Sequence, residues 1–243
     1  MEVVLSIMVP LLVLGLVIVG VVFAIQRVRR GEGVSLSLRQ VLAFYFYVMT
    51  VVTLLVAVGG LSRLVQAGLA VPLGREFSYY PFYYPDDYPV PVRLEAPPAA
   101  PAPAVAPTVA PPQKGPVAEE EEARRQKGLD QAFKEGILGG LNFTVVGGLF
   151  WLVHQWGRRR FGQNGDMLEN LYLIGLLSVF AGLTLYSLPS GINDTLRYYL
   201  LDARQGFNPP GGRLATAIVA LPFWLFYLSA AFRRLRASRA TAA

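Results

Sequence analysis

The sequence predicts an all-α membrane protein: a five-helix transmembrane bundle with its N-terminus outside, its C-terminus inside and a long outer loop rich in Pro, Ala and Tyr. The first observation is composition, because 53% of the 243 residues are hydrophobic, only 16% are charged and the mean hydropathy is +0.43. These values exclude an ordinary water-soluble enzyme. The second observation is a set of five long apolar segments, and the third is the distribution of basic residues between them.

Five segments lack Asp, Glu, Lys and Arg over lengths that meet or approach the roughly 20 residues needed to cross a bilayer core. They comprise residues 3–25, 41–61, 137–156, 171–188 and 214–232. The first segment resembles a signal peptide, but Glu2 replaces the usual basic start, the apolar stretch is too long and basic residues follow it. We therefore expect residues 1–30 to form a retained transmembrane anchor.

The basic residues indicate the orientation. With the N-terminus outside, the inner segments hold 11 of the 22 Lys and Arg residues but only three of the 16 acidic residues, which are Glu32, Asp166 and Glu169. Most of the other basic residues lie in one long loop, which contributes little to the positive-inside rule. The basic residues behind the net charge of +6 thus indicate orientation in a membrane and not binding to nucleic acid. We predict a multi-pass protein of the cell (inner) membrane, with the lipid bilayer as its partner.

The outer segment of residues 71–135 differs in composition from its surroundings, since it holds 13 of the 18 prolines. It follows the second transmembrane helix, which we expect within residues 39–70. Proline fixes φ and removes a backbone donor, so residues 96–112 should form an extended spacer. From about Val117, Glu and Arg side chains four residues apart predict a charged helix that continues into the third span.

A tyrosine cluster opens this outer loop and consists of Tyr79, Tyr80, Tyr83, Tyr84 and Tyr88. The rings either rest on lipid headgroups, where amphipathic aromatic side chains are favoured, or dock a protein partner. The general interfacial preference of Tyr favours the first interpretation. The second makes these five residues candidates for partner docking.

The last part of the chain, residues 136–239, is predicted to hold three spans and an outer interfacial helix near residues 194–205. Asp194 can cap that helix, and Leu196 and Tyr199 would share its apolar face. Small residues that allow close helix contact recur at about four-residue spacing in two spans. They are Gly136, Gly140, Thr144 and Gly148 in the third span and Gly175, Ser178 and Gly182 in the fourth. We expect these two spans to pack against each other; a glycine-lined pore is the less favoured alternative, because small-residue seams are common in helix packing.

Chemistry inside the membrane usually requires ionisable side chains that face the bundle interior, and the predicted cores contain no Asp, Glu, Lys or Arg. We expect no catalytic residue, no metal and no cofactor. His154 is the only histidine, and the chain has no cysteine. A histidine at this depth more often bonds a neighbouring helix, although it could supply one axial ligand to a haem or chlorin in a larger assembly. Asn142 is expected to form an interhelical hydrogen bond for the same reason.

Three short motifs carry a family resemblance: residues 39–48 (RQVLAFYFYV), the Tyr-Tyr-Pro sequences after the second span, and residues 147–156 (GGLFWLVHQW). From Arg39 onward, about four fifths of the chain, the pattern resembles an uncharacterised bacterial membrane family, the domain of unknown function 5671. The resemblance implies a four-helix membrane domain without assigned activity. The first span and the Ala/Pro spacer lie outside the pattern.

The leading functional hypothesis is a non-enzymatic accessory or assembly component of a membrane complex, or of a homo-oligomer, whose outer Tyr/Pro loop contacts the partner. One alternative is a small-solute pore or carrier through the glycine-rich helices. The other is a cofactor-holding subunit that uses His154.

Overall fold

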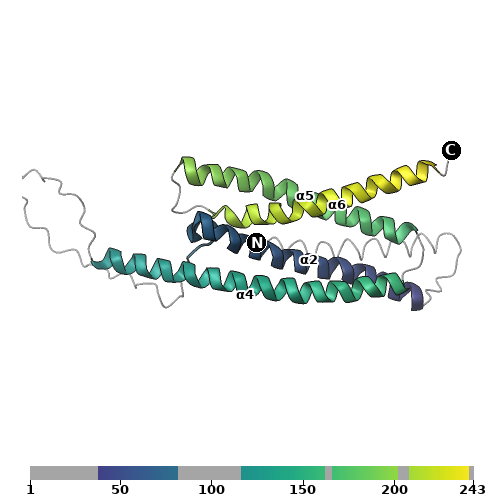
Figure 1. The fold of residues 1–243 in the computed structure, drawn as a ribbon, viewed down its shortest axis with the longest axis horizontal. Helices are drawn as coiled ribbons and strands as arrows, with labels where there is room; N and C mark the ends of the chain where they lie inside the picture. The colour runs from purple at the N-terminus through teal and green to yellow at the C-terminus, as the bar shows by residue number, and fades with distance from the viewer. Residues whose placement is uncertain (1–37, 82–115, 162–165, 202–207, 241–243) are drawn as a thin grey trace, which may run out of the picture.

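The computed structural model describes residues 38–81, 116–161, 166–201 and 208–240 (Figure 1). These residues form helices α2 (Leu38–Leu73), α3 (Arg75–Ser78), α4 (Pro116–Phe161), α5 (Asp166–Leu200) and α6 (Gly211–Ala240), with no strand in the described ranges. Helices α2, α4, α5 and α6 are long and apolar enough to cross a membrane. The all-α class is therefore confirmed for the described residues, and four of the five predicted spans coincide with helices that could cross a membrane. The predicted span 3–25 lies outside the described residues.

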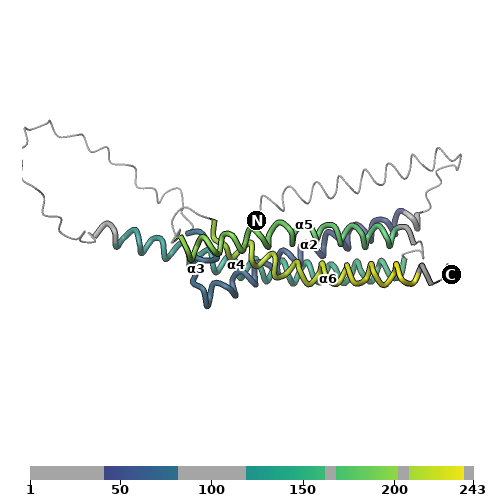
Figure 2. The backbone as a smooth tube through the Cα atoms, turned by 90° about the horizontal axis from the view of Figure 1, so that it is seen from above, coloured from purple at the N-terminus to yellow at the C-terminus, as the bar shows by residue number. Residues whose placement is uncertain are grey.

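The four long helices run antiparallel to their neighbours along one axis, as the two views at right angles show (Figures 1 and 2). Helix α2 packs on α4, α5 packs on α6, and α2 and α6 join the two pairs. The bundle thus has two ends. We call the end with residues 38, 161, 166 and 240 the arginine end and the opposite end, where α3 lies, the cap end.

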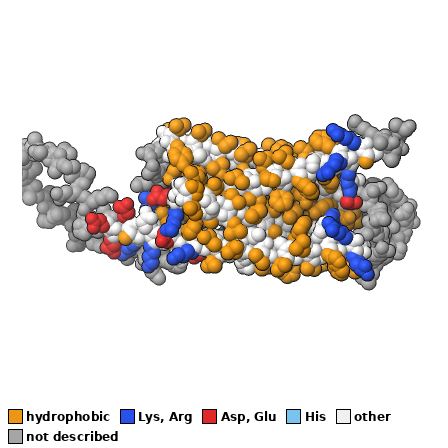
Figure 3. All heavy atoms as spheres, viewed as in Figure 1, with side chains coloured by type: hydrophobic (Ala, Val, Ile, Leu, Met, Phe, Trp, Pro, Cys, Tyr) orange, Lys and Arg blue, Asp and Glu red, His pale blue; other side chains and the backbone are white. Residues whose placement is uncertain are grey.

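The buried core lies between α2, α5 and α6. Phe180 of α5 is fully buried there and stacks on Phe223 of α6 with ring centroids 5.0 Å apart. Val51, Leu54 and Val58 of α2 complete this core. The outward side chains are mostly apolar, and Figure 3 shows them as a band that covers the middle of the molecule. Because water would not favour so much exposed apolar surface, the band fits a lipid environment.

Helix α4 packs against α2 through glycines on both helices. A Cβ on Gly147 would stand 2.6 Å from the backbone nitrogen of Ala57, and one on Gly140 would stand 2.9 Å from Leu64. Gly60 of α2 lies against Thr144 in the same way. At Gly147 and Gly60 the neighbouring atoms belong to backbone, so a larger side chain would force the helices apart.

The predicted packing of the third span on the fourth is wrong, because the small residues of α4 contact α2 and not α5. On α5, a Cβ on Gly175 or Gly182 would meet nothing within 4 Å, and Ser178 is exposed. Gly148 of α4 also faces open space. A small residue permits close approach but does not choose the partner helix, and α2 offers the matching small residues.

Helix α5 also differs from the prediction at its outer end. It continues through Pro189 to Leu200, so residues 189–200 extend the fourth span and do not form a separate interfacial helix. Neighbouring helices can hold such a continuation in place when proline removes a backbone hydrogen bond. Here Gly191 is buried against Leu214 of α6.

Candidate functional site

The cap end is closed by the four-residue helix α3. Helix α2 ends at Leu73, and Gly74 has φ +91°, a conformation that favours glycine and that turns the chain back toward the bundle. Phe77 then becomes fully buried against the rings of Tyr198 and Tyr199, at centroid distances of 5.4 and 6.2 Å. This helix was not predicted, although Gly74 after a long apolar helix is a turn signal.

Charged side chains of α3 hold α4 at the cap end. Arg75 forms an ion pair with Asp130, and Glu76 pairs with Arg125 at 3.3 Å. The Arg75 guanidinium also lies 5.2 Å from the centroid of the Phe133 ring. Because Leu129 is only 1% exposed within this contact, the segment of α4 from 125 to 133 is fixed to the bundle although it precedes the apolar part of the helix.

Beyond this contact α4 continues as an exposed arm, which we define as residues 116–124. Its side chains from 119 to 124 are exposed, and Glu120 pairs with Arg124 at 2.8 Å. Figure 1 shows the first turns of α4 extending past the other helices. The predicted charged helix from about Val117 is thus the first part of α4, which begins at Pro116.

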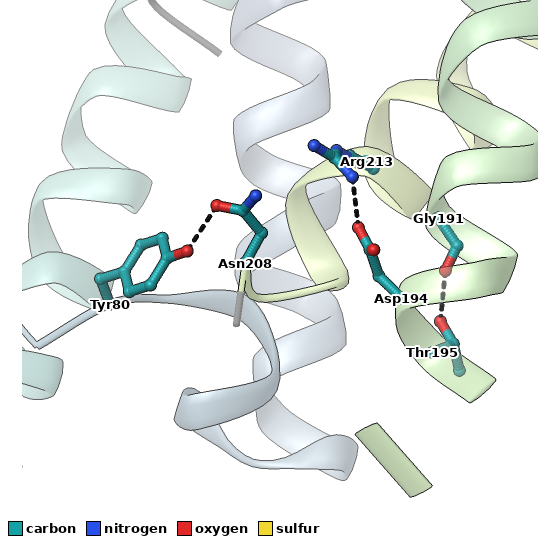
Figure 4. Close-up of polar contacts among 6 residues, drawn as sticks. All are labelled: Tyr80, Gly191, Asp194, Thr195, Asn208 and Arg213. Atoms are coloured by element: carbon teal, nitrogen blue, oxygen red, sulfur yellow. Dashed lines mark hydrogen bonds and ion pairs between the residues drawn. The ribbon is translucent and has the colours of Figure 1, made fainter. Parts of the chain in front are cut away.

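Two of the five candidate docking tyrosines are described, and both contact the protein itself. The ring of Tyr79 packs edge-to-face on Phe133 at 6.2 Å, and its hydroxyl lies against Gly136 without a hydrogen-bond partner. Burial raises the pKa of the Tyr79 hydroxyl, and nearby Arg63 opposes this only in part. Tyr80 donates a hydrogen bond to Asn208 (Figure 4). Tyr83, Tyr84 and Tyr88 lie outside the described residues.

Helices α5 and α6 are joined at the same end by Asp194 and Arg213, whose side chains pair at 2.6 Å (Figure 4). Asp194 lies inside α5, so it does not cap a new helix as predicted. Asp194 instead neutralises the charge of Arg213 at the start of α6. Gln66 of α2 donates a hydrogen bond of 2.5 Å to the carbonyl of Ser78, which ties α2 to the segment after α3.

His154 lies near the arginine end and is 7% exposed. Its Nδ1 is 2.7 Å from the carbonyl oxygen of Phe150, so Nδ1 carries the proton and donates to it. Its Nε2 then has a lone pair, which lies 3.5 Å from the Tyr45 hydroxyl. The aromatic rings of Tyr45, Phe46 and Phe150 surround the imidazole at centroid distances of 5.9 to 6.3 Å. This arrangement suits a neutral packing histidine, and it also leaves Nε2 as the one atom that could ligate a metal.

Two further predictions can be placed. Asn142 is exposed on α4 and therefore does not lie in the helix contact where an interhelical hydrogen bond was expected. Among the residues that the structure describes, no group of three or more His, Cys, Asp or Glu side chains could hold a metal ion.

Comparisons of the chain with protein-family models, curated proteins and solved structures found no match. The resemblance to the domain of unknown function 5671 therefore stays a prediction.

Proposed function

We propose that the protein is a non-enzymatic accessory or assembly component of a membrane complex, located in the cell (inner) membrane, that docks a partner through the segment between α3 and α4. The observation that supports this most is the arm of α4. From Pro116 to Gly136 the helix runs 21 residues before its uncharged part, which is about 30 Å at 1.5 Å per residue.

The described residues on either side of 82–115 therefore lie at different heights along α4. Tyr79, shortly before this segment, packs on Phe133, whereas Pro116, directly after it, begins the arm. The ion pairs of Arg75 and Glu76 fix the base of the arm. Because Tyr is favoured in protein interfaces, we place the partner contact in the Tyr/Pro/Ala sequence between these two positions.

The exposed acidic side chains of the arm, Glu119 to Glu122, outnumber its one arginine, Arg124, and give the arm a negative charge. Such a surface would steer a partner that carries basic side chains. The glycine-lined pore has less support, because Gly140 and Gly147 of α4 contact α2, and Gly175 and Gly182 of α5 have open space around them. His154 remains the residue for the cofactor alternative, through its Nε2 atom.

The test is purification from the native membrane in a mild detergent, followed by identification of the proteins that remain bound. The variant Tyr83→Ser/Tyr84→Ser/Tyr88→Ser changes only tyrosines outside the described cap and leaves Tyr79 and Tyr80 in their packed positions. If one of these rings is an anchor for the partner, its loss costs about 2 kcal/mol, so we expect the affinity to fall roughly thirtyfold or more.

The matched control deletes residues 99–110 of the spacer, which should alter reach but not contact. We expect the deletion variant to keep its partners and the serine variant to lose them, with both proteins inserted and folded. Equal behaviour of the two variants would show that the tyrosines only rest on lipid. A pull-down in which the wild-type chain is recovered alone would contradict the proposed role altogether.

A further inference from the structure

Arg158 of α4 has an unusual environment at the arginine end. Its guanidinium lies 4.3 Å from the ring centroid of Tyr172 on α5 and 5.3 Å from that of Tyr47 on α2. The two rings themselves meet edge-to-face at 5.7 Å. One arginine thus contacts aromatic rings from two other helices, although α4 and α5 share no extended interface.

Among the side chains that the structure describes, no carboxylate forms an ion pair with this arginine. Its Nε atom is buried and has no hydrogen-bond partner. Glu169, whose side chain is described at this end, pairs with Arg234 of α6, and Arg234 also donates to Asn170 at 3.0 Å. Desolvating a partly buried cation is costly, and among the described side chains it is the aromatic rings that offset this cost.

The surroundings of Arg158 are strongly basic. Of the charged side chains described at the arginine end, one is a carboxylate, Glu169, and the rest are arginines. These are Arg158, Arg159, Arg160, Arg233, Arg234 and Arg236. Figure 3 shows the basic side chains gathered at this end, directly beside the apolar band. The surface therefore attracts an anion at the depth where lipid headgroups lie.

We propose that Arg158, which lies against the rings of Tyr47 and Tyr172, binds the phosphate of an anionic phospholipid. Rings against a guanidinium leave its edge as the direction for hydrogen bonds, and that edge matches the oxygens of a phosphate. Exposed apolar side chains continue from the same place toward the membrane centre, with Leu171 39% exposed and Ile174 58% exposed on α5. A ligand with an anionic head and acyl chains matches both the basic surface and the apolar surface, whereas a free anion matches only the basic one.

The test uses the full chain in a neutral detergent with dioleoylphosphatidylglycerol, dioleoylphosphatidylcholine or inorganic phosphate as the probe. Native mass spectrometry gives the apparent affinity, and thermal unfolding gives an independent readout. A charge-assisted contact to phosphate predicts a preference for the anionic lipid of about tenfold. We expect Arg158→Gln to reduce this preference to about twofold. Arg236→Gln removes an exposed arginine of the same rim and should keep the preference.

Three results would overturn the proposal: no preference in the wild-type chain, an equal loss in both variants, or equal stabilisation by inorganic phosphate and by the anionic lipid. The second result would indicate a diffuse field, and the third a site for small anions. If Arg158→Gln does not fold, Arg158→Lys decides, because it keeps the charge but lacks the planar fork. We expect Arg158→Lys to lose most of the preference, and a full preference in that variant would contradict the stacked geometry.

Discussion

The hydroxyl of Tyr79 is buried against Gly136 without a hydrogen-bond partner, whereas its ring makes a favourable contact with Phe133. An unsatisfied buried hydroxyl costs free energy, so Tyr79→Phe should raise the free energy of unfolding by about 1 kcal/mol. Tyr79→Ser should lower it by about 2 kcal/mol or more, because it removes the ring. Thermal unfolding in detergent measures both. A loss of stability in the Phe variant would show that the hydroxyl has a favourable contact.

The same hydroxyl predicts a pH dependence at the cap end. Burial raises the pKa of Tyr79 in the folded chain above its value of about 10 in the unfolded chain. Above pH 10 the unfolded state therefore loses its proton first, so stability that is present below pH 10 falls as the pH rises through the folded pKa. Tyr79→Phe should make the unfolding temperature fall less between pH 9 and pH 11, and an unchanged slope would contradict this assignment.

His154→Phe distinguishes a packing residue from a ligand. Phe keeps an aromatic body among Tyr45, Phe46 and Phe150 but cannot coordinate a metal. Since the only short hydrogen bond of the imidazole is to the Phe150 carbonyl of its own helix, we expect a cost of about 1 kcal/mol and a colourless protein before and after the change. Absorption spectra of the protein from native membranes check this. Loss of a pigment would support the cofactor alternative.

Helix α4 carries neighbouring glycines in opposite environments, which gives a matched pair of variants. A Cβ on Gly147 would meet the Ala57 backbone at 2.6 Å, whereas Gly148 has open space around it. Gly147→Leu should therefore separate α4 from α2 and lower the unfolding temperature and the abundance of the protein. Gly148→Leu adds a side chain on the outer surface and should be nearly neutral. Equal effects of the two variants would contradict the α2–α4 contact.

The glycines also show how far sequence patterns predict an element's neighbours. The spacing of Gly136, Gly140, Thr144 and Gly148 predicted a contact face, because small residues are what close helix approach requires. Gly140 and Thr144 do lie against α2, whereas Gly148 has open space around it. The spacing did not identify α2 as the partner, since Gly175 and Gly182 on α5 have the same pattern but no contact. Which helix packs against α4 depends on where Gly60 and Ala57 of α2 lie when the two helices run antiparallel. The spacing of small residues along one helix does not contain this three-dimensional information.

Helix ends were predicted less well than helix cores for a related reason. The uncharged segments predicted the four described spans, but α5 continues past Pro189 because contacts of Gly191 and Asp194 with α6 support it. Helix α3 was not predicted because four residues carry no periodic signal. Its stability comes from the burial of Phe77 against α5. The cap thus depends on contacts between distant residues, which local propensity does not report.

The whole molecule combines an apolar band with two different polar ends (Figure 3). At the cap end, acids and arginines pair across helices, as in the contacts of Arg75 with Asp130 and of Arg213 with Asp194. At the arginine end, basic side chains exceed carboxylates among the described residues. A positive end and a balanced end are what the positive-inside rule places inside and outside, respectively.

This asymmetry predicts the topology, which cysteine labelling measures directly because the chain has no cysteine of its own. A cysteine at Ala100, in the segment between α3 and α4, should react with an impermeant thiol reagent in intact cells. A cysteine at Ser238, near the end of α6, should react only after the cells are opened.

A third cysteine, at Val145, provides the control for the membrane itself. Val145 is 55% exposed in the structure, so a cysteine there would react from either side if the apolar band faced water. We expect no reaction under either condition, because lipid covers this surface and a charged reagent does not enter the hydrocarbon core. Labelling of Val145→Cys would contradict the membrane-embedded band, whereas equal labelling of the first two positions in intact cells would contradict the orientation and leave the band unaffected.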